Sequence, residues 1–352
     1  MITPATGNLL ESDAEAVVNT VNCVGVMGKG IALQFKQAYP ELLPAYEQQC
    51  EEGRLMPGHV QVLSTNRVVG PRFVINFPTK RHWKDKSKLA DIESGLKSLV
   101  KAVRAHTITR IALPPLGCGN GGLKWSEVQP LIVAAFAGLP AVEVLLYAPG
   151  AAPSAEQMPV ATEATGLNRN RALLIALIAR YGEPGYRLTM LEVQKLAYLL
   201  HTVLPLPRLI FAAHKYGPYA DNLNFVFQRM EGHYTRGYGD RSRSATQLSL
   251  LPGAEDAAKT ILATDAEAQA ALDRVTALID GFETPHSMEL LATTHWVALH
   301  HADAAQAPSA ARSRVHAWNP RKRQIFTEHH ITVAWQRLHD QGWISEPQVI
   351  PR

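Results

Sequence analysis

The sequence has few cysteines and no long uninterrupted run of apolar residues. Of its 352 residues only three are cysteines, Cys23, Cys50 and Cys118, and their spacing matches no zinc motif. An odd set of thiols without metal spacing is typical of a reducing compartment. No apolar stretch is long enough to span a bilayer, and the pattern of a signal peptide is absent. These features predict a cytoplasmic protein that does not bind membranes.

Common metal and nucleotide signatures are also missing. The 14 histidines form no HExxH pattern, so we expect no metal site. The glycines follow neither the P-loop spacing nor the GxGxxG fingerprint. A net charge of +4 is too small to indicate nucleic-acid binding without a local basic patch. What remains is an ordinary globular composition, and the length predicts two domains.

Residues 1–149 alternate short apolar runs with amphipathic segments, which is typical of an α/β domain. Ile92, Leu96 and Leu99 share one face of a predicted helix, as expected of a helix that covers a sheet. We therefore predict a three-layer α/β domain with binding loops at the C-terminal ends of its strands. The expected strands are 16–21, 59–64, 73–77, 110–113 and 142–147, and the expected helices are 31–38, 42–52, 90–105 and 126–136.

A stretch rich in proline and alanine, residues 150–166, is predicted to be a linker to a second domain at 167–352. Strand-like alternation is scarce there, so we predict an all-α domain with two irregular loops at 236–252 and 301–320. The apolar stripe of residues 190–203 is interpreted as core rather than as a partner groove. The expected helices are 172–180, 190–203, 220–230, 257–282, 288–300 and 326–341.

The stretch from Asn19 to Leu33 passes from an apolar strand through a loop with Gly25, Gly28 and Gly30 into a helical pattern. A glycine-rich turn at a helix N-terminus leaves backbone N–H groups unpaired, and the helix dipole adds positive potential. Such a loop suits a phosphate or pyrophosphate, although an ordinary strand-to-helix turn has the same pattern.

A second glycine-rich stretch, from Leu113 to Trp125, also follows a strand and precedes a helix. Two such loops at strand ends can hold a diphosphate from both sides, whereas a single small anion needs only one. The pair therefore favours a ligand that contains a pyrophosphate.

Lys80 follows the predicted strand at 73–77 and is expected at the same rim as the glycine loops. Partial desolvation there lowers the pKa of a lysine and makes it a nucleophile toward an anomeric or carbonyl carbon. The next residues, Arg81, His82, Trp83 and Lys84, combine cations with an aromatic ring, as in sites for single-stranded nucleic acid. A solvated charged loop has the same composition, so both interpretations stay open.

Three strings resemble those of a known family: NTVNCVGVMGKGIALQF at 19–35, INFPTK at 75–80 and LPPLGCGNGGLKW at 113–125. On these strings, residues 1–149 resemble macrodomains, the ADP-ribose-binding α/β/α fold, and in particular the branch that includes DNA and glutamate ADP-ribose hydrolases. Over its whole length the chain resembles the antitoxin of the DarT–DarG toxin–antitoxin family. The strings KLAYLLH, HKYGPYADNL and WNPRKRQIF of the second half resemble its toxin-binding part.

The resemblance implies a macrodomain with a mixed sheet flanked by helices, followed by a mostly α-helical toxin-binding domain. It implies that Lys80 attacks C1″ of the distal ribose and that Asn22 contacts this ribose. Asn8 stands where many macrodomains have an aspartate for the adenine. ADP-ribose would be ligand and product, with no cofactor. The residues implied to contact ADP-ribose are Asn8, Leu9, Gly25, Val26, Met27, Gly28, Lys29, Gly30, Gly117, Cys118, Gly119, Asn120 and Gly121.

One position departs from the family pattern. The related glutamate-specific hydrolase has a catalytic aspartate where this chain has Gly121. We therefore expect Lys80 and Asn22, with water or a substrate group, to carry out the reaction. The resemblance implies removal of ADP-ribose from thymine in single-stranded DNA, and inhibition of the cognate ADP-ribosyltransferase toxin by residues 167–352.

Two other functions fit the same residues. One is a non-catalytic ADP-ribose reader, in which Lys80 is only a phosphate or ribose contact. The other is a hydrolase that acts on ADP-ribosylated protein carboxylates. Release of ADP-ribose from modified DNA, from modified peptide or from neither distinguishes the three.

Overall fold

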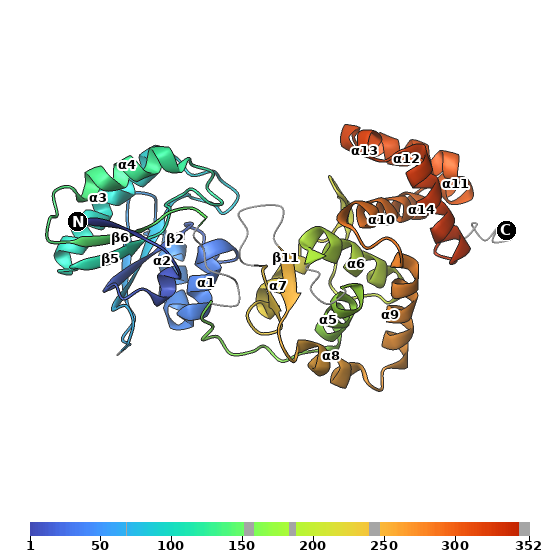
Figure 1. Ribbon diagram of the computed structural model, residues 1–352, viewed down its shortest axis with the longest axis horizontal. Coiled ribbons are helices and arrows are strands. Elements are labelled where there is room, and N and C mark those ends of the chain that lie inside the picture. Colours follow the sequence, from blue (N-terminus) through green and yellow to red (C-terminus); the bar gives the residue numbers. More distant parts are fainter. Residues whose placement is uncertain (68, 151–157, 183–187, 239–246, 345–352) are drawn as a thin grey trace. The chain divides into compact units, whose positions relative to one another are not determined.

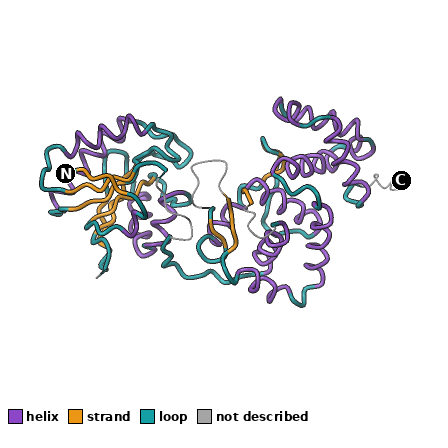
Figure 2. Tube along the Cα trace, in the orientation of Figure 1, coloured by secondary structure: helices purple, strands orange, loops and turns teal. Residues whose placement is uncertain are grey.

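The computed structural model describes residues 1–352 except 68, 151–157, 183–187, 239–246 and 345–352 (Figure 1). The chain divides into two compact units. The first contains Met1–Ala164 and a segment that begins at Arg236, and the second contains most of the remaining chain. Strands are concentrated in the first unit and helices make up most of the second (Figure 2).

The first unit is built on a six-stranded sheet with the order β1-β6-β5-β2-β4-β3. All neighbouring strands pair in parallel except β3 with β4, so the predicted mixed sheet is confirmed. The first strand was not predicted, because it is a four-residue edge strand that contains Pro4. The strands are β1 (Ile2–Ala5), β2 (Ala16–Val21), β3 (Gln61–Ser64), β4 (Phe73–Pro78), β5 (Arg110–Leu113) and β6 (Glu143–Tyr147).

Helices cover both faces of this sheet, which confirms the predicted three layers. On one face, Ile92 of α3 (Leu89–Ala105) and Ile132 of α4 (Trp125–Phe136) belong to one apolar cluster with sheet residues. On the other face, Phe35 of α1 (Gly30–Ala38) and Tyr46 of α2 (Leu43–Glu51) lie in two smaller clusters. Because both faces are covered, the strands are apolar on both sides, as in other parallel sheets.

Part of the predicted linker at 150–166 packs against the first unit. Residues 151–157 lie outside the described part of the chain, but Met158 is buried in the same cluster as Phe35. The backbone amide of Ala161 donates to the carbonyl of Gln37 at 2.8 Å. The second half of this stretch is therefore not a free linker, because its methionine fills apolar surface beside the sheet.

The second unit is mainly helical, as predicted. Its helix α6 (Met190–Val203) is buried on most sides, which confirms the interpretation of its apolar stripe as core. The other helices are α5 (Arg169–Tyr181), α7 (Leu223–Met230), α8 (Ala254–Leu262), α9 (Ala266–Ile279), α10 (Pro285–His300), α11 (Ala302–Gln306), α12 (Pro308–Trp318), α13 (Pro320–Ile325) and α14 (Glu328–Asp340).

Two of the predicted helical boundaries in this unit were wrong. The single helix expected at 257–282 is split into α8 and α9, because the side chain of Asp265 accepts from the amide of Ala268 at 2.9 Å and caps a new helix. The irregular loop expected at 301–320 instead contains α11 and α12. Pro308 and Pro320 occupy the first turns of helices, a position that proline tolerates because the first N–H groups of a helix have no partner within it.

The expected all-α character of this unit was also wrong in detail. A three-stranded sheet with the order β10-β11-β7 and a two-stranded hairpin of β8 and β9 are present. Strands of two to four residues are too short to show the alternation that predicts a strand. Two of them occupy the ends of the loop expected at 236–252, of which residues 239–246 are not described. The strands are β7 (Leu188–Thr189), β8 (Ala212–His214), β9 (Gly217–Tyr219), β10 (Thr235–Arg236) and β11 (Gln247–Leu250).

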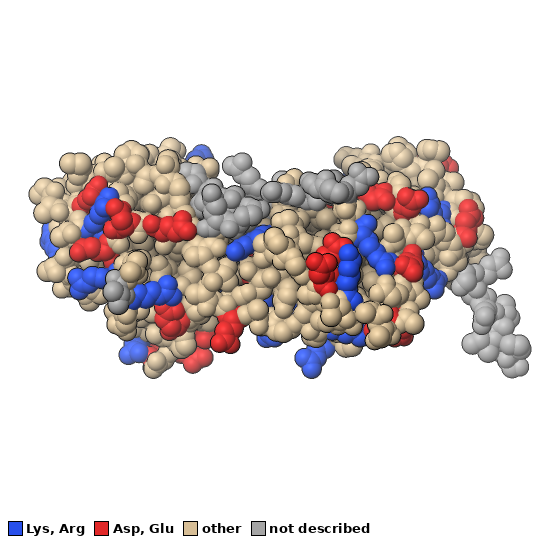
Figure 3. All heavy atoms as spheres, turned by 60° about the horizontal axis from the view of Figure 1, so that its bottom comes forward, with Lys and Arg blue, Asp and Glu red and all other residues tan. Residues whose placement is uncertain are grey.

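No helix in the described ranges is long and apolar enough to cross a membrane. On the face shown in Figure 3, basic and acidic side chains are interspersed, in keeping with the net charge of +4.

Candidate active site

Three loops meet at one edge of the six-stranded sheet. Strands β5, β2 and β4 are adjacent and parallel, so the loops that follow them, residues 114–124, 22–29 and 79–88, begin side by side. The amide of Cys23 donates to the carbonyl of Arg81 at 3.0 Å, and the amide of Ser87 donates to the carbonyl of Gly121 at 3.0 Å. The two glycine loops and the Lys80 loop therefore lie together, as expected from their positions at strand ends.

The side chain of Asn22 shapes the first glycine loop. Its Oδ1 accepts from the amide of Val24 at 3.0 Å, and its Nδ2 donates to the carbonyl of Val26 at 2.6 Å. Gly25 lies between them with φ +76°, a conformation that favours glycine. Asn22 thus points into the loop, and the second N–H of its Nδ2 stays available for a further acceptor.

Gly121 in the second loop lies where no larger residue fits. A Cβ at this position would lie 2.2 Å from Ser87 Oγ and 2.4 Å from the carbonyl oxygen of Gly117. The Ser87 hydroxyl is buried and has no hydrogen-bond partner among the described residues. The packing of the loop therefore leaves no space for an aspartate side chain at this position.

Asn120 connects the second loop to the first loop and to Lys80. A Cβ on Gly30 would lie 3.2 Å from Asn120 Nδ2, which brings the start of α1 next to the second loop. The carbonyl of Asn120 accepts from Lys80 Nζ at 3.4 Å. Neither α1 nor α4 has a side-chain cap at its N-terminus.

The Lys80 amine is partly buried between the loops. Its Nζ also donates to the carbonyls of Trp83 at 3.3 Å and Asp85 at 3.4 Å. The pKa of Lys80 is lowered, first by burial and second by the positive charge of Lys86, while Asp85 acts in the opposite direction. A lower pKa increases the population of the neutral amine, which is the nucleophilic form.

The basic run beside Lys80 presents an aromatic ring to solvent. Trp83 is 50% exposed, and Lys84 Nζ lies 4.8 Å from the centroid of its ring. The ring of His82 lies 5.1 Å from it, whereas Arg81 forms an ion pair with Asp91 at 3.3 Å. An exposed ring flanked by a cation suits the stacking of a base beside a phosphate.

The other residues predicted to contact the ligand differ in their position and in the burial of their side chains. Asn8 follows β1 at the same edge of the sheet, four strand spacings, or roughly 19 Å, from β4. The side chains of Leu9 and Met27 are buried in core clusters, so only their backbones can face a ligand. Burial raises the pKa of the Cys118 thiol to about 11, which agrees with a packing role rather than nucleophilic catalysis.

Two buried residues next to the loops, Tyr46 and Ser87, were not predicted from the sequence. Tyr46 is part of a helical pattern and Ser87 lies in a charged run, so neither has a local signal. Their proximity to the site depends on contacts between distant segments. Among the described residues, no group of three His, Cys, Asp or Glu side chains could hold a metal ion.

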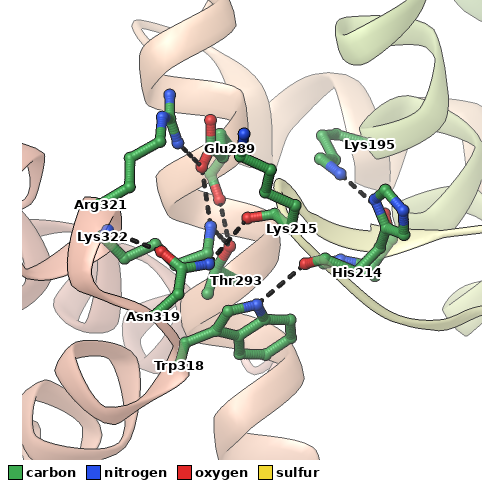
Figure 4. A network of polar contacts seen from close by, with 10 residues as sticks. Lys195, His214, Lys215, Glu289, Thr293, Trp318, Asn319, Arg321 and Lys322 are labelled. Carbon is green, nitrogen blue, oxygen red and sulfur yellow. Dashed lines mark hydrogen bonds and ion pairs between the residues drawn. The ribbon is translucent and has the colours of Figure 1, made fainter.

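The three strings singled out in the second unit converge on the turn between β8 and β9 (Figure 4). Trp318 Nε1 donates to the carbonyl of His214 at 2.9 Å, and Asn319 Nδ2 donates to the carbonyl of Lys215 at 3.0 Å. From α6, Lys195 Nζ donates to the carbonyl of Pro218 at 2.7 Å. The exposed turn of Lys215 and Tyr216 is therefore held by three side chains, one from α6 and two from the end of α12 and the residue that follows it.

Buried charges lie beneath this turn. Lys322 Nζ donates to Glu289 at 2.8 Å and to Thr293 Oγ1 at 2.9 Å, and Arg321 donates to the same carboxylate at 2.6 Å. Burial lowers the pKa of Lys195 to about 7, with a further contribution from the charge of Lys322. Buried ions are costly unless they are paired, so this network favours one arrangement of the turn.

The three-layer fold and the paired glycine loops at one sheet edge define the first unit as a macrodomain. The Macro domain family model matches residues 18–132. Over 351 residues the chain is 43% identical to a DNA ADP-ribosyl glycohydrolase of Thermus aquaticus, with 98% of this chain and 96% of that protein covered. The chain therefore belongs to the DNA ADP-ribosyl glycohydrolase family, and the predicted family and enzyme class are confirmed.

Two further proteins are similar to part of the chain. The solved macrodomain of Mycobacterium tuberculosis DarG is 53% identical, covers 43% of this chain and 99% of that chain, and has a TM-score of 0.42. A DNA ADP-ribosyl transferase-DNA ADP-ribosyl glycohydrolase fusion protein of Thermosipho africanus is 33% identical over an alignment of 141 residues, with 36% of this chain and 36% of that protein covered.

Proposed function

We propose that this enzyme removes ADP-ribose from thymine bases of single-stranded DNA, with Lys80 as the nucleophile. The observation that carries the proposal is the position of Lys80 Nζ, 3.4 Å from the Asn120 carbonyl in the second glycine loop. A diphosphate held between the two loops would bring the attached ribose close to this amine, and such positioning lowers the barrier to attack.

In this mechanism the neutral amine of Lys80 attacks C1″ of the ribose. The bond between C1″ and the base nitrogen breaks, and its electron pair leaves with the base, which takes up a proton. Water then releases ADP-ribose from Lys80. The diphosphate stabilises the positive charge that develops on the ribose, and the reaction needs no cofactor. Because position 121 cannot hold a carboxylate, the proton comes from water or from the substrate.

The DNA strand would contact the run from Arg81 to Lys84. In this arrangement the exposed ring of Trp83 stacks on a base next to the modified one, and Lys84 interacts with a phosphate. The protein would act in the cytoplasm, in keeping with the three free thiols.

The second unit would bind the cognate ADP-ribosyltransferase toxin. The Thermosipho relative supports a link to such an enzyme, because its name combines a transferase with a glycohydrolase. The turn of Lys215 and Tyr216 offers the exposed aromatic ring of Tyr216, a residue type that is enriched in protein interfaces. Retention of the transferase by the immobilised full-length chain, in the presence of excess ADP-ribose, tests this part. Loss of the transferase in the wash would contradict it.

Two substrates separate the candidate activities. We expect release of ADP-ribose from an ADP-ribosylated thymidine oligonucleotide and none from an ADP-ribosylated glutamate peptide. Release from the peptide alone would favour the carboxylate hydrolase. Binding of both substrates without release would indicate a non-catalytic ADP-ribose reader.

A further inference from the structure

Tyr46 of α2 is fully buried beneath the first glycine loop. Its side chain is 0% exposed and lies in an apolar cluster with Val21, Met27 and Leu55. A buried hydroxyl is unfavourable unless it forms a hydrogen bond. Asn22 supplies two acceptors for this hydroxyl, its carbonyl oxygen at 3.0 Å and its Oδ1 at 3.2 Å, and the Cys50 thiol is a further hydrogen-bonding neighbour.

The amide group of Asn22 transmits this contact into the loop. The same Oδ1 accepts from the amide of Val24, while Nδ2 donates to the carbonyl of Val26. Because an amide group is planar, fixing its oxygen also fixes the direction of its nitrogen. Three donors converge on this oxygen: Tyr46 Oη, the Val24 amide and, at 3.5 Å, the Val26 amide. A flipped amide would place Nδ2 against the two backbone donors. By bonding both oxygens of Asn22, the hydroxyl holds the side chain in the position from which it makes these loop contacts.

Gly25 gives the loop a second contact with α2. Its Cα lies so close to the helix that a Cβ would contact the Cγ of Glu47 at 3.7 Å and the Cβ of Cys50 at 3.9 Å. The loop is thus supported by α2 at two places, the Tyr46 hydroxyl and the helix surface under Gly25. Fixed loop geometry increases affinity, because less freedom is lost when a ligand binds.

We propose that Tyr46 is a positioning residue for the first glycine loop. It touches no ligand; its hydroxyl orients the Asn22 amide, and this amide holds the backbone from Val24 to Val26 in the form that receives the diphosphate. The inference rests on the proposed binding of ADP-ribose between the loops. Tyr46→Phe removes the hydroxyl but leaves the ring in its apolar cluster, so the core stays filled.

Calorimetric titration of the full-length protein with ADP-ribose tests this role. We expect Tyr46→Phe to weaken binding about tenfold, the effect of one lost hydrogen bond to the loop. If Tyr46 acts through the Asn22 side chain, the same change in an Asn22→Ala background weakens binding by clearly less than tenfold, because only the backbone carbonyl of residue 22 is then left as its acceptor. Wild-type affinity in Tyr46→Phe, or an undiminished tenfold loss in the Asn22→Ala background, would overturn the proposal.

The matched control is Tyr198→Phe in the second unit, which also removes a buried hydroxyl with a hydrogen bond, to His295 Nδ1 at 2.9 Å. This variant should bind ADP-ribose like the wild type. A loss equal to that of Tyr46→Phe would mean that the effect is not local, and would overturn the proposal as well.

Amide hydrogen exchange gives a readout that needs no ligand. In Tyr46→Phe the amide of Val24 should exchange faster than in the wild type, whereas the amide of Val18 inside β2 should not change. Unchanged exchange at Val24 would contradict the role of Tyr46. Absence of ADP-ribose binding by the wild type would contradict the proposed function instead, so the two failures are distinguishable.

Discussion

At Lys80, burial and a neighbouring cation act in the same direction on one amine. Burial is the larger cause of its lowered pKa and Lys86 the second, while Asp85 opposes both. Three backbone carbonyls accept from the ammonium form, so they stabilise the protonated state until substrate displaces them. The reactivity of this lysine therefore depends on the loop that surrounds it.

The pH dependence of the reaction tests this description. In Lys86→Gln the positive charge near Lys80 is gone, so the pKa of Lys80 rises toward its ordinary value. A smaller fraction of the amine is then neutral at a given pH. We expect the rise of kcat/KM with pH to move to higher pH and the activity at neutral pH to decrease. Lys88→Gln, in the same loop, is the control and should keep the wild-type profile.

Gly121 is packed so closely that a larger residue there should lower the stability of the protein. Gly121→Ala places a Cβ against Ser87 and the Gly117 backbone, and overpacking of this kind costs roughly 1–3 kcal/mol of the free energy of unfolding. Gly119→Ala is the matched control, since a Cβ there meets nothing within 4 Å. The denaturant concentrations at the midpoints of unfolding compare the two variants. Equal midpoints would show that the loop accommodates the added Cβ without loss of stability.

The sequence predicts those parts of the site whose position follows from the ends of the strands. Lys80 and the glycine loops follow parallel strands, so their meeting at one edge depends only on which segments are strands. The orientation of Asn22 could not be predicted, because it depends on Tyr46, which lies 24 residues away on another element. Likewise, the space at Gly121 is taken by Ser87 from another loop, and no local pattern indicates this.

Among the elements, helix caps decide boundaries that apolar periodicity does not show. Residues 257–282 keep a helical pattern throughout, yet the Asp265 side chain starts a new helix. At 301–320, first-turn prolines begin α12 and α13, although a proline in sequence more often marks a loop. The long amphipathic helices of the first unit were predictable because one whole face packs on the sheet.

A capping interaction at the N-terminus of α6, in the second unit, contributes to its stability. Thr189 caps α6 in a capping box with Glu192, each side chain bonded to the other residue's backbone. Thr189→Ala should lower the free energy of unfolding of this unit by about 1 kcal/mol, within a range of roughly 0.5–2 kcal/mol. Thr260→Ala, within α8, removes a hydroxyl that bonds only to the preceding turn and should have a smaller effect. Urea titration compares the two, and equal losses would argue against the cap.

For the whole molecule, two separate cores mean that stability and activity can respond differently to pH. His295 of α10 is 1% exposed, and burial lowers its pKa from 6.5 to about 4. Between these values the unfolded chain binds a proton that the folded chain does not. The contribution of His295 is therefore complete above pH 6.5 and decreases as the pH falls toward 4, by about 3 kcal/mol in total.

Unfolding of the second unit, followed at pH 7 and pH 5, measures this dependence. The wild type should be less stable at pH 5, and His295→Gln, which cannot be protonated, should lose most of the difference. If His295→Gln kept the full pH dependence of the wild type, groups other than His295 would cause the loss of stability at pH 5.

Two measurements on Lys80→Ala show most directly whether Lys80 is the nucleophile. They are the release of ADP-ribose from an ADP-ribosylated thymidine oligonucleotide and the calorimetric affinity for free ADP-ribose. We predict no detectable release, with an affinity within about threefold of the wild type, because the lysine acts on the reacting carbon while the loops hold the ligand. Release at the wild-type rate by this variant would contradict the assignment of Lys80 as the nucleophile.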